Sequence, residues 1–269
     1  MLAFYKALPD DPFVTAARAY SEAKLAMLNG DLSSAERFYR TAAEGFSRID
    51  RPIMRSMCVG MVADFDEHSE NYPAAIKGLE ETVETNDALG LRGFMGAQLV
   101  RLGWALLQNG NMERAELMYR RALDVARRLS NAPVIFLALS GVAVLHRLHG
   151  RNSEATTAAT EALELYLVNR PRRFENRVDP RADVLIAAAV CCVVLASIDA
   201  ETGNGAYAAR LLGQADHLRS DAAAPVPTFL NADLDRAHHT MVTLLGNPEF
   251  LAAFEYGRQG QLGDDVAFR

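Results

Sequence analysis

Residues 99–122 read LVRLGWALLQNGNMERAELMYRRA and contain the clearest helix pair in the chain. Leucines recur from Leu99 to Leu106 at the three- and four-residue spacing of one helix face, and Gly110 follows where this pattern stops. Glycine ends helices because it adopts the left-handed cap conformation without a Cβ clash. Small and aromatic residues then recur at helical spacing from Ala115 onward, which predicts a second helix antiparallel to the first.

The same turn signal recurs along most of the chain. Its anchors fall at residues 30, 70, 110, 150 and 203, so the intervals are 40, 40, 40 and 53 residues, and an alanine follows each anchor five positions later. First helices are predicted at 13–29, 53–69, 92–109, 133–149 and 182–202. Second helices are predicted at 32–48, 73–89, 112–129, 152–168 and 205–219.

One helix pair cannot bury its apolar face alone, whereas several stacked pairs can. We therefore expect an all-α fold, a right-handed α-solenoid of helix hairpins. Five repeats should occupy residues 1–220, with a loop inserted at 169–181, and a C-terminal helical cap should occupy 221–269. In the cap, a helix starting near Thr228 should end at Gly246, and Asn247 should cap a last short helix.

The bulk composition excludes several classes of protein. Half of the 269 residues are apolar, the mean hydropathy is −0.03 and the net charge is −6, which is typical of a soluble globular protein and argues against nucleic-acid binding by this region. The longest charge-free apolar stretch, 184–198, is too short to span a membrane and should be a buried helix. The chain shows no secretory signal and no disulfide framework, so the predicted compartment is the cytoplasm.

The inserted loop is rich in arginine. Four of its side chains are candidate contacts for an anionic partner: Arg170, Arg172, Arg173 and Arg177. The alternative is that the loop is a solvated connector between repeats.

The leucine, glycine, alanine and tyrosine series at 99–122 resembles a tetratricopeptide repeat, although the unit here has 40 residues and the usual one about 34. The longer unit is similar to the helical sensor regions of bacterial transcriptional regulators, such as the maltose regulator and its LuxR-type relatives. Residues 208–219 and 247–258 resemble the end of this region in actinobacterial predicted-ATPase regulators. The resemblance covers nearly the whole chain. It implies tetratricopeptide-like hairpins and a role in transcription regulation and signal transduction.

Those regulators also carry a P-loop ATPase and often a helix-turn-helix module. The chain contains neither a Gly-x4-Gly-Lys-Ser/Thr motif nor a DNA-reading segment. It is therefore either a fragment of such a regulator or a stand-alone relative.

The sequence carries little that points to catalysis. Metalloprotease, serine hydrolase and dinucleotide-binding motifs are missing from it, and we expect no cofactor, no metal site and no enzyme activity. Asp64, Asp66 and Glu67 form an acidic cluster beside His68, so an enzyme that uses this cluster is one alternative. A solvated or partner-facing helix surface explains the cluster without chemistry.

The first helices of such an array line its concave side. On the tetratricopeptide frame, the predicted wall residues are Tyr20, Lys24, Met57, Met61, Asp64, Arg101, Trp104, Gln108, Ser140, Arg147 and Ser197. Aromatic residues and arginine often anchor interfaces, and methionine adapts to varied partners. Trp104 fits the groove and the core equally well.

The sequence therefore predicts a non-catalytic interaction or sensor module of a bacterial regulator. It would bind a protein, a peptide or a small effector in its concave groove, without membrane contact. The alternative is a stand-alone scaffold or adaptor, and a homo-oligomer is compatible with both.

Overall fold

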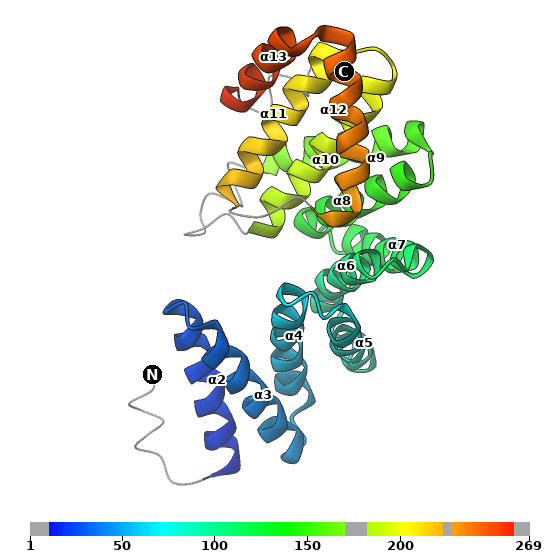
Figure 1. The fold of residues 1–269 in the computed structure, drawn as a ribbon. Coiled ribbons are helices and arrows are strands. Elements are labelled where there is room, and N and C mark those ends of the chain that lie inside the picture. The colour runs from blue at the N-terminus through cyan, green and yellow to red at the C-terminus, as the bar shows by residue number, and fades with distance from the viewer. Residues whose placement is uncertain (1–10, 170–181, 223–226, 261–269) are drawn as a thin grey trace. The chain divides into compact units, whose positions relative to one another are not determined.

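The computed structural model describes residues 11–169, 182–222 and 227–260. Within these ranges the chain is built from twelve α-helices and contains no strand (Figure 1). The helices are α2 (Pro12–Leu28), α3 (Leu32–Arg48), α4 (Pro52–His68), α5 (Tyr72–Ala88), α6 (Arg92–Gln108), α7 (Met112–Arg128), α8 (Ala132–Leu148), α9 (Asn152–Asn169), α10 (Ala182–Glu201), α11 (Gly205–Asp221), α12 (Asn231–Leu245) and α13 (Asn247–Gln259), with a 3-10 turn η2 (Thr228–Leu230). The expected all-α fold of helix hairpins is confirmed, and the ten repeat helices end within two residues of their predicted bounds.

The chain forms two compact units, Met1–Met118 and Tyr119–Arg269, which we call unit 1 and unit 2. Unit 1 contains α2 to α6, and unit 2 contains α8 to α13. The boundary lies within α7. The predicted division into repeats over 1–220 and a cap over 221–269 stays a prediction.

A residue with positive φ follows each helix of the regular array, and it recurs every 20 residues. Glycine takes this position at residues 30, 90, 110 and 150. Asp50, Glu70 and Ser130 adopt the same left-handed conformation although they carry side chains. Helices of 17 residues joined by three-residue links give this period, which is half of the predicted 40.

The turn after α2 shows how these links work. Asp31 N–H donates to Ala26 C=O at 2.9 Å, and Gly30 N–H donates to Met27 C=O at 3.1 Å. These two bonds satisfy carbonyl groups that the helix end would leave without partners, and they need a left-handed residue between them. The following helix therefore starts at once and packs against the one before it.

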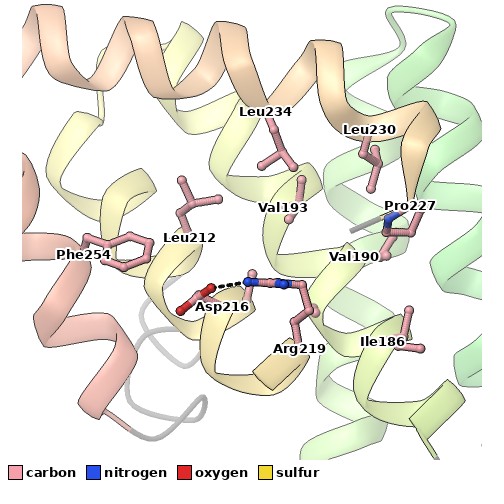
Figure 2. A pocket seen from close by; sticks show the side chains of 12 residues that line it. Ile186, Val190, Val193, Leu212, Asp216, Arg219, Pro227, Leu230, Leu234 and Phe254 are labelled. Atoms are coloured by element: carbon pink, nitrogen blue, oxygen red, sulfur yellow. Dashed lines mark hydrogen bonds and ion pairs between the residues drawn. The ribbon is translucent and has the colours of Figure 1, made fainter. Parts of the chain in front are cut away.

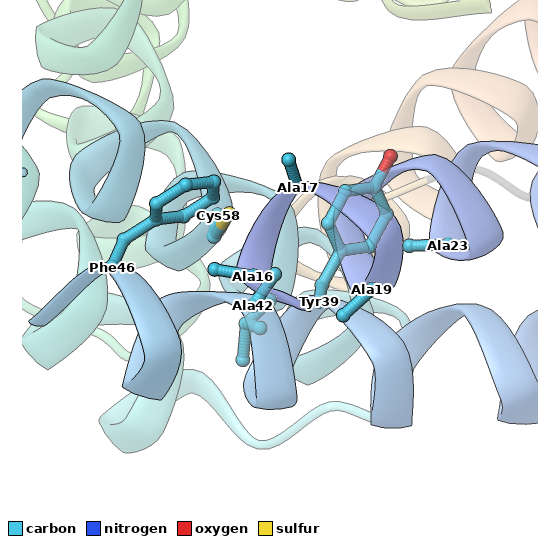
Figure 3. Close-up of a cluster of buried hydrophobic side chains, with 9 residues drawn as sticks. Ala16, Ala17, Ala19, Ala23, Tyr39, Ala42, Phe46 and Cys58 are labelled. Carbon is cyan, nitrogen blue, oxygen red and sulfur yellow. The ribbon is translucent and has the colours of Figure 1, made fainter. Parts of the chain in front are cut away.

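The core of unit 1 is clear where α2, α3 and α4 meet (Figure 3). The buried residues of α2 are all alanines, such as Ala16 and Ala23, so the backbone of α3 approaches closely. Helix α3 fills the space with Tyr39 and Phe46, and α4 adds Cys58. Small residues on one helix thus face aromatic residues on the next.

Helix α10 is the central helix of unit 2 and contacts α8, α9, α11 and α12. Residues 187–200 are buried without interruption. The helix has the length and hydropathy of a membrane span over Asp183–Glu201, but 89% of that stretch is buried inside the protein. The expected buried helix is confirmed, and its environment is that of the core helix of a soluble protein.

The last two helices agree with the sequence in position but not in capping. Helix α12 ends at Leu245, and Gly246 follows with a φ of 80° as expected. The predicted cap by Asn247 is wrong, because Gly246 is the N-cap of α13 and Asn247 is already helical. A link of one residue must end one helix and begin the next, which leaves no position for a separate cap side chain.

We expect Glu70→Gly to raise the free energy of unfolding by about 0.5 kcal/mol, because glycine removes the strain of a left-handed glutamate at some cost in chain entropy. The matched opposite change is Gly110→Ala at the equivalent turn, where no atom lies within 4 Å of an added Cβ. It should lower the same free energy by about 1 kcal/mol through backbone strain alone. Urea denaturation of both variants measures this, and equal effects of the same sign would contradict it.

Candidate functional site

Arg101 and Asp64, two predicted wall residues of unit 1, lie together between α6 and α4. The Arg101 guanidinium forms an ion pair with Asp64 and donates to Gly60 C=O at 3.2 Å. It also donates to Gln98 Oε1 on its own helix at 3.2 Å. Arg101 is partly exposed, so one side of this pair faces solvent.

Glu67 joins this pair, although it was predicted only as a member of the acidic cluster. Its carboxylate lies 3.8 Å from the Arg101 guanidinium. Burial raises the pKa of Glu67 to about 7, against the favourable effect of Arg101 and with a further rise from Asp64. The wall of unit 1 therefore holds a carboxyl group that titrates near neutral pH.

The rest of the acidic cluster is divided among different surroundings. Asp66 pairs with Arg40 of α3 at 3.1 Å, away from the Arg101 contact. The His68 ring nitrogen Nδ1 hydrogen-bonds with Asp64 C=O at 2.9 Å, within its own helix. Among the described residues, no group of three or more His, Cys, Asp or Glu side chains is placed to hold a metal ion.

The wall residues on α2 and α4 combine aromatic, cationic and thioether groups. The Lys24 ammonium lies 5.6 Å from the centroid of the Tyr20 ring, and Tyr20 packs edge-to-face on Tyr39 of α3. Burial raises the pKa of the Tyr20 hydroxyl. Met61 packs partly against the α2–α4 core, whereas the Met57 side chain is 48% exposed. Lys24 and Met57 are thus the accessible members of this group.

Trp104 and Gln108 of α6 are both partly buried. The structure places Trp104 between the two alternatives that the sequence left open, since its ring is neither in the fully buried core nor fully in solvent. A contact of either residue with a partner stays a prediction.

The three predicted wall residues of unit 2 are buried instead. Ser140 is buried in α8 and donates to Leu137 C=O at 2.7 Å, and Ser197 is buried in α10. Arg147, at the end of α8, is 8% exposed. As placed, none of the three offers a surface to a partner.

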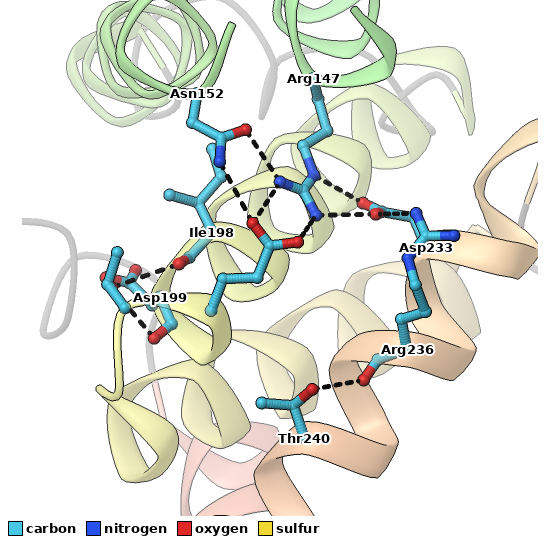
Figure 4. A network of polar contacts seen from close by, with 9 residues as sticks. Arg147, Asn152, Ile198, Asp199, Asp233, Arg236 and Thr240 are labelled. Atoms are coloured by element: carbon cyan, nitrogen blue, oxygen red, sulfur yellow. Dashed lines mark hydrogen bonds and ion pairs between the residues drawn. The ribbon is translucent and has the colours of Figure 1, made fainter. Parts of the chain in front are cut away.

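Arg147 is the centre of a polar cluster that joins four helices (Figure 4). Its guanidinium donates two hydrogen bonds to Glu201 of α10 and two to Asp233 of α12, at 2.5–2.9 Å. It also donates to Asn152 Oδ1 of α9 at 2.8 Å. Arg236, one turn further along α12, donates to Asp233 at 2.8 Å. We call these five residues the Arg147 cluster.

The charges of the Arg147 cluster stabilise one another. Hydrogen bonds from Arg147 lower the pKa of Glu201. Burial opposes ionisation of Asp233, but the hydrogen bonds and charge of Arg147 lower its pKa below the usual value. Asp233 and Glu201 were missed in the sequence analysis because they lie 86 and 54 residues from Arg147. The available signal was Arg147 itself, a charged residue at the end of the apolar stretch 132–148.

The four candidate arginines of the inserted loop, Arg170, Arg172, Arg173 and Arg177, lie outside the described residues. Their predicted contact with an anionic partner stays a prediction.

Helix hairpins at a fixed spacing, with short left-handed links, define a helical-repeat protein. No protein-family model matches the chain, and no curated protein matches it in sequence. The structural resemblance to solved proteins is nevertheless extensive. BtubC (BKLC) from P. vanneervenii has a TM-score of 0.57 and 18% identity, over 91% of this chain and 89% of that one.

A second solved structure is a Signal Transduction ATPase with Numerous Domains (STAND) protein with a tetratricopeptide repeat sensor, from Pyrococcus horikoshii. It has a TM-score of 0.58 and 16% identity, and the match covers 95% of this chain but 40% of that protein. At these identities the resemblance concerns the fold. It supports a helical-repeat array of the tetratricopeptide type.

We expect Arg147→Met to lower the free energy of unfolding by about 3–5 kcal/mol, because it leaves the carboxylate of Asp233 buried without a counter-charge. Arg127→Met is the control, since Arg127 pairs with Glu161 at 3.5 Å on an exposed surface. It should cost less than about 1 kcal/mol. Adding Asp233→Asn to Arg147→Met should recover part of the loss, and urea denaturation measures all three. Equal losses for Arg147→Met and Arg127→Met would contradict the buried cluster.

The raised pKa of Glu67 predicts a pH-dependent stability. Between the ordinary glutamate value of 4.5 and about 7, the folded protein keeps a proton that the unfolded chain has released. The free energy of unfolding should therefore fall as the pH rises through this window, by up to roughly 2 kcal/mol. Glu67→Gln should remove this slope, and the exposed Glu84→Gln should keep it. Denaturation at pH 5 and pH 8 compares them, and an unchanged slope in Glu67→Gln would count against the assignment.

Proposed function

We propose that the chain is a non-catalytic helical-repeat module that binds a protein segment on the first helices of unit 1. The observation that carries this proposal is the contrast between the two units. The eight predicted wall residues of unit 1 are all exposed or partly exposed, whereas the three of unit 2 are buried. Only unit 1 therefore keeps a wall that a partner can reach without a rearrangement.

The accessible groups of this wall favour a segment with an apolar side chain. The thioether of Met57 is flexible and accessible, and methionine packs against varied apolar surfaces. Lys24 and Arg101 add positive charge, but Arg101 already faces Asp64 and Glu67. A free carboxylate on the partner would therefore pair with Lys24 rather than with Arg101.

We further propose that the module serves as the sensor region of a bacterial cytoplasmic regulator. The support is the similarity in fold to a STAND protein with a tetratricopeptide repeat sensor, together with the 40-residue repeat. A ligand of such a sensor acts by binding one arrangement of the array more tightly than another. A stand-alone adaptor would use the same wall without an attached effector domain.

Selection from a phage-displayed library of random 12-residue peptides tests the binding proposal. Peptides selected on the full chain should lose at least tenfold in affinity for the double variant Lys24→Glu/Met57→Glu. The matched control is Lys77→Glu/Leu32→Glu, which makes the same kinds of change at exposed positions on the second helices α5 and α3. It should leave affinity unchanged, as measured by isothermal titration calorimetry.

Circular dichroism shows whether both double variants remain folded. Equal affinity of the selected peptides for the wild type and the Lys24→Glu/Met57→Glu variant would place the binding surface elsewhere and would contradict the proposal.

A further inference from the structure

Unit 2 contains a cavity of about 120 Å³ between the α10–α11 hairpin and the last two helices (Figure 2). Val190 and Val193 of α10 and Leu212 of α11 form one side of it. Leu234 of α12 and Phe254 of α13 face them from the other side. The walls are therefore aliphatic and aromatic, and they come from four different helices.

The cavity exists because α13 is held against α11 at a fixed point. A Cβ atom on Gly213 would lie 2.0 Å from Phe254 C=O, and one on Gly257 would lie 2.0 Å from Arg210 C=O. The two backbones thus touch, and neither helix can turn or shift to fill the space beside them. On the opposite side, α12 is fixed on α10 by the buried Leu230 and Met241. Protein interiors are otherwise close-packed, so an apolar space of this size is unusual.

One side of the cavity is polar but carries no net charge. Asp216 and Arg219 of α11 line it and pair with one another at 2.6 Å. Both remain partly exposed, so each keeps capacity for a further hydrogen bond. The next charges, Arg258 and Glu255 of α13, also pair with one another at 2.7 Å. A ligand with a charged end would meet the like-charged member of the Asp216–Arg219 pair at close range.

These features define the class of ligand. An engineered apolar cavity of about 150 Å³ in another protein binds benzene, so the present cavity has the size for a single ring or a branched aliphatic group. A hydroxyl or amide group can accept from Arg219 and donate to Asp216 at the same time. We propose that this cavity binds a small molecule with one ring-sized apolar body and one uncharged hydroxyl or amide group. The site is separate from the unit 1 wall.

Occupation of the cavity would also act on the Arg147 cluster. Leu234 lines the cavity, and its neighbour Asp233 is the partner of Arg147. A ligand that packs against Leu234 therefore favours the position of α12 in which the ion pairs are made. This gives a small effector a route to the stability of unit 2 that does not involve the wall of unit 1.

Four probes with one ring and different end groups test the ligand class on the full chain: benzyl alcohol, toluene, benzoate and benzylamine. Methyl NMR titrations should show saturable shifts at Val190, Val193, Leu212 and Leu234 with benzyl alcohol, with a dissociation constant on the order of millimolar. Toluene should bind more weakly, and benzoate and benzylamine at least tenfold more weakly. Equal binding of benzoate or benzylamine would overturn the proposed role of the Asp216–Arg219 pair.

Filling the cavity tests the location. Ala215→Leu adds a side chain at a buried position of α11 that lines the cavity, and it should abolish the saturable shifts. Ala206→Leu makes the same change at an exposed position of α11 and should preserve them. If Ala215→Leu does not fold by circular dichroism, Leu212→Phe fills the same space from a partly exposed position.

Shifts that persist in the filled variant, or that never saturate, would overturn the site. Peptide binding to unit 1 is measured with other variants, so the outcome here is independent of the proposed function.

Discussion

The left-handed residue that follows each helix is the constraint on which the rest of the array depends. It allows the chain to end one helix, satisfy two of its last carbonyl groups and start the next within three residues. Every helix of the regular part consequently has 17 residues, and equivalent positions recur at the same height. Burial of Ala35, Ala75, Ala115 and Ala155 follows from this spacing, because each lies five residues after a turn.

The two units use equivalent positions of their first helices in different ways. In unit 1 the charged pair of Arg101 and Asp64 stays at the surface. In unit 2 the corresponding charge, Arg147, is enclosed by Glu201 and Asp233 because α12 supplies an additional helix beside α10. The C-terminal helices therefore do more than cover an apolar end, since they take up polar groups that would otherwise be open to a partner.

The sequence predicted the helices well because their signals are local. Apolar spacing, turn glycines and alanines five positions later lie within one hairpin. It predicted half of the turns only, since Asp50 and Ser130 adopt a glycine-like conformation that their residue types disfavour. The site was harder, because exposure of a first-helix residue depends on which later helix packs beside it. Periodicity placed Met57 and Ser197 on the same predicted wall, yet one is exposed and the other is buried.

The separation of Arg147 and Asp233 along the chain has a consequence for folding order. Neighbouring helices meet through links of three residues, so each hairpin forms from local contacts at small entropic cost. The contact between Arg147 and Asp233 joins groups 86 residues apart and requires the intervening helices to be in place. It is expected to form after the folding transition state. Interactions of this kind slow unfolding more than they speed folding, so the Arg147 cluster would set the lifetime of folded unit 2.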